Sequence, residues 1–186
     1  MKIINEILSS PQTVFTIQRI CLMNGDKSDV SIRKSINYFV KSGQLLNPRR
    51  GIYAKPNYNE REMACAVFHP SYISLEYVLS RCGVTFQYSD EITSVCYKNR
   101  SIEIDGKSYS FRRINPVIWT NMAGIVQRGN IAIATPERAF LDLLYLSAGN
   151  CHFDNLRPID RRLVKKLLPF YNSETLTKRA TEILKK

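Results

Sequence analysis

Residues 28–55 read SDVSIRKSINYFVKSGQLLNPRRGIYAK, which we interpret as a basic helix, a stop and a short hairpin. Ser28 and Asp29 are residue types that cap helix N-termini. Four apolar residues then recur at helical spacing: Ile32, Ile36, Phe39 and Val40. Gly43 tolerates the left-handed conformation that commonly ends a helix. The segment therefore predicts a helix that packs through one apolar stripe.

The remaining sides of this expected helix are polar, and the tip of the hairpin is cationic. The candidate DNA-binding residues of the two elements are Arg33, Lys34, Asn37, Tyr38, Lys41, Arg49 and Arg50. Arginine can bond a guanine edge, asparagine an adenine edge, and lysine a phosphate. The run Pro48-Arg49-Arg50-Gly51 predicts the turn between two short strands. The combination is typical of a winged helix-turn-helix that binds DNA, and the alternative is a solvated amphipathic helix in an unrelated helical domain.

Three more elements are expected before this segment. We predict a helix at residues 2–8, a short strand at 13–15, and a helix at 17–23 that Thr16 caps. The stretch Lys55-Pro56-Asn57-Tyr58-Asn59 favours turns over helix, so we place a domain boundary there. The sequence thus predicts a winged helix-turn-helix domain at residues 1–56 and an α/β domain at residues 57–186.

The expected second domain alternates between helical and strand patterns. We predict helices at residues 60–68, 75–82, 137–146, 161–168 and 174–184, the second capped by Ser74 and the third by Thr135. We predict strands at residues 92–97, 101–104, 108–114, 118–119, 125–127 and 131–134. Asp105-Gly106-Lys107 predicts a hairpin turn within this set. The predicted fold class is α+β, with a mixed α/β second domain that contains an antiparallel sheet.

The formal net charge of +11 is unevenly distributed along the 186 residues. Residues 1–56 hold nine Lys/Arg against three Asp/Glu, residues 57–150 hold nine against nine, and residues 151–186 hold nine against four. The excess of cations in residues 1–56 indicates a nucleic-acid partner. The excess in residues 151–186 is equally compatible with binding a nucleic acid, binding an acidic partner, or simple exposure to solvent. No apolar run approaches the length of a membrane span and no leader peptide is expected, so we expect a cytoplasmic protein.

Motifs for catalysis or for a cofactor are sparse. The five cysteines are spread singly without a CxxC pair, which favours free thiols over disulfides or a metal site. No phosphate-binding glycine loop and no Gly-x-Ser-x-Gly motif occurs. Asp90, Asp105 and Lys107 loosely match the acid and Asp-x-Lys layout of metal-dependent nucleases, but a hairpin turn is the simpler account of Asp105. We therefore expect no enzyme activity, no metal and no cofactor.

Residues 135–146 form the most distinctive string of the second domain. Arg138, Asp142 and Tyr145 follow one another at helical spacing on an otherwise apolar helix. We predict an ion pair between Arg138 and Asp142, because a mostly buried helix needs charges that offset one another. The favoured interpretation is a core helix, and a protein-binding role for an exposed part of the stripe is the alternative.

Four strings of the sequence match a known family in order and spacing. They are RRGIYAKP at residues 49–56, HPSYISLE at 69–76, ITSV at 92–95 and ATPERAFLDLL at 134–144. In these motifs the chain resembles the AbiEi-type antitoxins of type IV toxin–antitoxin, or abortive infection, systems. The resemblance implies a winged-helix domain that represses its own operon. It also implies a second domain that counteracts a nucleotidyltransferase toxin without a stable complex.

Three functions remain open on the sequence. The first is a DNA-binding antitoxin and autorepressor, whose partners are the operator duplex and the toxin. The second is a stand-alone winged-helix regulator whose second domain senses a ligand or binds a protein. The third is a metal-dependent nuclease that uses Asp90, Asp105 and Lys107.

Overall fold

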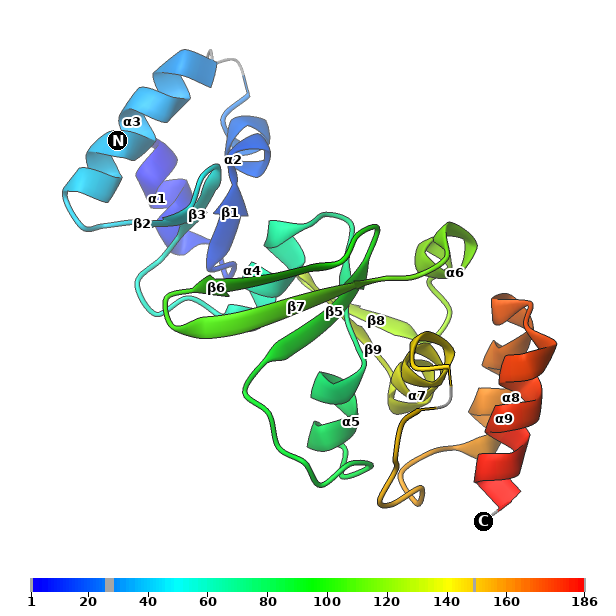
Figure 1. Ribbon diagram of the computed structural model, residues 1–186. Coiled ribbons are helices and arrows are strands. Elements are labelled where there is room, and N and C mark those ends of the chain that lie inside the picture. Colours follow the sequence, from blue (N-terminus) through cyan, green and yellow to red (C-terminus); the bar gives the residue numbers. More distant parts are fainter. Residues whose placement is uncertain (1, 26–28, 149, 186) are drawn as a thin grey trace. The chain divides into compact units, whose positions relative to one another are not determined.

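The computed structural model describes residues 2–25, 29–148 and 150–185. The chain divides into two compact units, the first ending at Val67 and the second beginning at Phe68. We call them unit 1 and unit 2, and Figure 1 traces the elements of both. None of the helices in the described ranges is long and apolar enough to cross a membrane.

Unit 1 combines helices with a small sheet. Its elements are α1 (Lys2–Ser9), β1 (Val14–Thr16), α2 (Ile17–Met23), α3 (Asp29–Lys41), β2 (Leu46–Arg49), β3 (Ile52–Ala54) and α4 (Glu60–Val67). The strands pair antiparallel in the order β1-β3-β2, with Val14 opposite Ala54 and Arg49 opposite Ile52. The predicted helices, the first strand and the hairpin are therefore confirmed.

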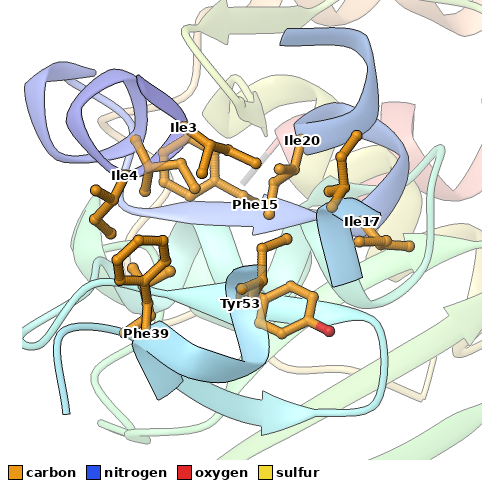
Figure 2. Packing of buried hydrophobic residues seen from close by; sticks show 11 residues of the cluster. Ile3, Ile4, Phe15, Ile17, Ile20, Phe39 and Tyr53 are labelled. Atoms are coloured by element: carbon orange, nitrogen blue, oxygen red, sulfur yellow. The ribbon is translucent and has the colours of Figure 1, made fainter. Parts of the chain in front are cut away.

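The core of unit 1 is made by side chains from α1, β1, α2, α3, β3 and the segment after α3 (Figure 2). Its buried members are Ile3, Ile4, Ile7, Phe15, Ile17, Ile20, Ile32, Ile36, Phe39, Leu45 and Tyr53. The predicted stripe of α3 is confirmed, with Val40 half-buried at its edge. Thr16 caps α2 by accepting a hydrogen bond from the Arg19 amide, as predicted. The predicted cap at Ser28 lies outside the described residues.

Unit 1 extends through α4, beyond the predicted boundary at residue 56. The buried Glu62 carboxylate of α4 accepts hydrogen bonds from the amides of Thr13 (2.7 Å) and Val14 (3.0 Å). Met63 of the same helix is fully buried. The turn-rich stretch after Lys55 is thus a bend inside one unit, because α4 returns to the start of β1.

Replacing Glu62 with alanine should destabilise unit 1. Two amides would lose their acceptor, and each unsatisfied buried group costs about 1–3 kcal/mol, so we expect a loss of about 2–4 kcal/mol in the free energy of unfolding. Urea denaturation followed by circular dichroism measures this loss. Glu62→Gln keeps an acceptor oxygen and should recover most of the stability. Equal losses in the two variants would contradict the role of the oxygen.

Unit 2 is built around a six-stranded sheet. Its strands are β4 (Tyr72–Ile73), β5 (Ile92–Cys96), β6 (Arg100–Ile104), β7 (Lys107–Arg113), β8 (Ile125–Arg128) and β9 (Ile131–Ala134). Its helices are α5 (Glu76–Arg81), α6 (Pro116–Thr120), α7 (Pro136–Leu146), α8 (Arg161–Leu167), the 3-10 helix η1 (Leu168–Tyr171) and α9 (Glu174–Lys185). The α+β class is therefore confirmed.

The sheet of unit 2 contains both antiparallel and parallel pairs, whereas the prediction was an antiparallel sheet. The strand order is β6-β7-β5-β4-β9-β8. β5 with β7 and β4 with β9 are parallel, while the other three neighbouring pairs are antiparallel. The predicted hairpins β6–β7 and β8–β9 are present. The parallel pairs arise because β7 returns beside β5 and because the two-residue β4, which the sequence did not predict, lies between β5 and β9.

Two local predictions in unit 2 are wrong. Ser74 does not cap α5, since Leu75 occupies the N-cap position at φ 62° and the Ser74 hydroxyl donates to the Asp142 carboxylate instead. Ile118 and Trp119 lie in the helix α6, where a strand was predicted. Asn115 caps that helix through its side-chain oxygen, which accepts from the Val117 amide at 2.9 Å, and Pro116 occupies the first turn. The helix start therefore overrides the strand preference of the two residues.

Candidate nucleic-acid interface

The predicted DNA-binding side chains of α3 lie on the surface of unit 1. Those that are exposed are Arg33, Lys34, Asn37, Tyr38 and Lys41. They are exposed because Ile32, Ile36 and Phe39 turn the opposite face of the helix into the core. Tyr38 is 67% exposed, and its ring contacts the edge of Phe39 with centroids 5.4 Å apart. The helix thus presents two lysines, an arginine, an amide and a phenol to solvent.

The hairpin after α3 is braced at its tip. Arg49 ends β2 and is half-buried, and the exposed Arg50 follows in the turn. Gly51 adopts φ 79°, and its carbonyl accepts a hydrogen bond from the Ile17 amide at 2.9 Å. The Asn47 side-chain amide donates to the carbonyls of Arg49 (2.9 Å) and Ile52 (2.7 Å). The turn is tighter than the predicted residues 48–51, because Asn47 holds both strands together close to the tip.

Unit 2 contains a buried charge network around α7, and the predicted ion pair is part of it. Arg138 Nε donates to Asp142 Oδ1 at 3.1 Å, and neither side chain is exposed. Asp142 also accepts from the hydroxyls of Ser74 (2.8 Å) and Tyr171 (2.6 Å). Tyr145 is half-buried, with its ring 5.8 Å from that of Tyr171. The predicted ion pair is confirmed.

Every N–H of the Arg138 side chain has an acceptor. Besides Asp142, the acceptors are the Tyr72 hydroxyl (3.0 Å) and the carbonyls of Ile118 (2.8 Å), Asn121 (3.1 Å) and Ala123 (2.8 Å). A guanidinium has five N–H donors, so its capacity is fully used. Arg138 therefore holds α6 and the following segment against α7, and no N–H is left for a ligand.

Burial and neighbouring charges shift the pKa values of the titratable groups in this network. Burial acts to lower the pKa of the Arg138 guanidinium, but Asp142 and the two tyrosines raise it overall. Burial, and then the Asp142 charge, raise the pKa of the hydroxyls of Tyr72 and Tyr171. Burial also raises the pKa of the Asp142 carboxyl, an effect that Arg138 opposes. The cluster is a closed structural element without access for a substrate.

The residues of the nuclease hypothesis lie at one end of the segment formed by β5, β6 and β7. Lys107 Nζ is 4.0 Å from Asp90 Oδ1, because β5 and β7 start side by side, and the Asp90 side chain is 73% exposed. Asp105 lies in the β6–β7 turn at φ 50°. Across the described ranges, no group of three or more His, Cys, Asp or Glu side chains lies close enough to hold a metal ion. The geometry therefore offers nothing that favours this hypothesis.

The five cysteines are free thiols, as predicted. Burial is the main cause that raises the pKa of Cys82, Cys96 and Cys151. A raised pKa keeps a thiol protonated and weakens it as a nucleophile.

Comparison of the sequence with models of known protein families found no model that matches, and comparison with curated proteins found no match.

Proposed function

We propose that unit 1 is a winged helix-turn-helix domain that binds duplex DNA. The observation that carries this proposal is the division of α3 into a buried apolar face and an exposed cationic face. The exposed face holds Arg33, Lys34 and Lys41 beside the amide of Asn37. Such side chains suit base edges and phosphates of a major groove, which admits a helix.

The hairpin β2–β3 would serve as the wing. Arg50 is exposed at its tip, and the tip is tied to the start of α2 through the Ile17–Gly51 hydrogen bond. A braced tip holds its arginines at a fixed place within unit 1. Arginines at such a tip can contact phosphates or a narrow minor groove.

We further propose that the protein represses its own operon and acts as an antitoxin against a nucleotidyltransferase toxin. This part is supported by the motifs at residues 49–56, 69–76, 92–95 and 134–144, which resemble those of AbiEi-type antitoxins. The experiment is co-expression with the neighbouring gene, combined with gel shifts on duplex DNA from upstream of the protein's own gene. Rescue of growth together with a specific shift supports both activities. A specific shift without rescue indicates a stand-alone regulator, and no shift rejects the DNA-binding proposal.

The double substitution Arg49→Ala, Arg50→Ala should weaken binding to all duplex DNA by about tenfold at moderate salt and flatten the dependence on salt. Each lost phosphate contact lowers the slope of log K against log salt by about 0.9, so the two substitutions lower it by about 1.8. Gel shifts at several salt concentrations measure both quantities. An unchanged affinity and slope would exclude the hairpin from the interface.

A further inference from the structure

The strand pairing of unit 2 separates charges that the sequence intermixes. β5 and β7 run parallel with Cys96 opposite Arg113, and β6 runs antiparallel with Arg100 opposite Phe111. The end of β5, the start of β6 and the end of β7 therefore meet at one end of this three-stranded segment. The cations gathered there are Lys98, Arg100, Arg112 and Arg113.

The acids of the same strands lie at the opposite end. They are Asp90 and Glu91 before β5, Glu103 late in β6, and Asp105 in the β6–β7 turn. Lys107 at the start of β7 also lies at this end, with its Nζ 4.0 Å from Asp90 Oδ1. Residues 57–150 have no net formal charge, so the composition hides this separation. The pairing thus creates a local cationic surface within a region that is neutral on average.

The cations at this end are available to a partner. Lys98, Arg100 and Arg113 are exposed, and none of them forms an ion pair with a carboxylate in the described part of the chain. The Arg113 backbone amide donates to Asn99 Oδ1 at 2.7 Å, which fixes the loop between β5 and β6 against the end of β7. The charges therefore project from a fixed strand end.

Two aromatic rings lie beside these cations. Tyr97, directly after β5, is 45% exposed, and Trp119 of α6 is half-buried with its ring centroid 6.0 Å from that of Tyr97. α6 follows directly on β7 along the chain (Figure 1). The buried Phe68 supports Tyr97 with centroids 6.1 Å apart, and Lys98 Nζ lies 4.5 Å from the Phe68 ring. We call Tyr97, Lys98, Arg100, Arg113 and Trp119 the strand-end patch.

We propose that the strand-end patch binds single-stranded nucleic acid, with bases stacking on its rings and phosphates contacting its cations. Aromatic rings that solvent can reach in a cationic setting, here the exposed Tyr97 and the half-buried Trp119, are the arrangement that single strands use, because each free base has a face to stack. A duplex hides its base faces within the helical stack and would leave the rings without a partner. An acidic protein would use the charges and leave the stacking surface unused. The patch belongs to unit 2 and α3 to unit 1, so this activity is additional to the proposed duplex binding.

Trp119 makes the test specific, because it is the only tryptophan of the chain. The intact protein is titrated with oligo(U), with oligo(dT), and with a duplex, while its tryptophan emission is recorded. We expect the single strands to quench the emission in a saturable manner and the duplex to leave it unchanged. The RNA and DNA arms show which kind of single strand binds more tightly. No quenching by either single strand, together with no change in the anisotropy of the labelled strands, overturns the proposal.

Substitutions locate the binding at the patch. Tyr97→Leu keeps an apolar contact with Phe68 but removes the ring, and should weaken single-strand binding by about tenfold. Replacing Lys98, Arg100 and Arg113 with alanine should lower the salt slope by about 2, at about 0.7 per contact. The matched control is Arg128→Ala, an exposed cation in β8 at the other edge of the sheet, which should change neither quantity. Equal effects in Arg128→Ala would overturn the assignment to this patch.

A substitution of the α3 face separates this proposal from the proposed function. Lys34→Ala, Asn37→Ala, Lys41→Ala should lose duplex binding and keep the quenching of Trp119 by single strands. If wild-type protein binds no duplex but single strands still quench Trp119, the duplex proposal fails alone. If duplex binding is intact and quenching is absent, only the strand-end proposal fails.

Discussion

Replacing Arg138 with alanine should lower the free energy of unfolding of unit 2 by about 3–5 kcal/mol, because the buried Asp142 carboxylate would lose its cationic partner. Four other acceptors would lose an N–H at the same time, among them the carbonyls of Ile118, Asn121 and Ala123. Trp119 lies in α6, next to Ile118, so its emission reports the unfolding of this region in urea.

Two controls identify the buried charge as the cause. The double variant Arg138→Met, Asp142→Leu removes both charges and should lose less stability than Arg138→Ala, since no unpaired charge remains. Arg128→Ala removes an exposed arginine from the same unit and should change the free energy of unfolding by less than about 0.5 kcal/mol. A loss below about 1 kcal/mol in Arg138→Ala would contradict this explanation, because it would mean that the buried Asp142 carboxylate does not need Arg138 as its partner.

The features that the sequence predicts well are those whose signals lie within a few residues. The stripe of α3 follows from apolar side chains that recur at helical spacing. Thr135 and Pro136 start α7, and Asp105-Gly106 turns β6 into β7 with both residues at positive φ. The same periodicity predicts which positions of α3 are exposed, because the residues on the opposite side of the helix from the buried stripe face solvent.

The features that the sequence does not predict depend on partners far along the chain. Ser74 has the residue type of a cap, yet its hydroxyl is used by Asp142, 68 positions later. β4 spans two residues, too few for any periodicity, and exists because β5 and β9 flank it. The strand-end patch likewise requires the parallel pairing of β5 with β7. By contrast, the start of α6 had a local signal in Asn115 and Pro116, which the strand preference of Ile118 and Trp119 masked.

The triple substitution Lys34→Ala, Asn37→Ala, Lys41→Ala should reduce the affinity for duplex DNA from upstream of the gene by about 100-fold or more at about 0.1 M salt. The two lysines would each contribute a phosphate contact, and their loss should lower the salt slope by about 1.8. The amide of Asn37 can pair with adenine, which contributes about 1–3 kcal/mol of discrimination. Fluorescence anisotropy of the labelled duplex at several salt concentrations measures affinity and slope together. The fold should be retained, because all three side chains are exposed.

The single variants separate the phosphate contribution from the base contribution. Asn37→Ala should change the order of preference among duplex sequences while the salt slope stays as in the wild type, since an amide carries no charge. Lys34→Ala and Lys41→Ala should instead weaken binding to all sequences about equally. Arg61→Ala, an exposed cation on α4 of the same unit, is the matched control and should leave the sequence preference unchanged. α3 exposes these side chains because its apolar stripe is buried on the opposite side. If the triple variant binds duplex DNA with wild-type affinity, this exposed face of α3 does not contact DNA.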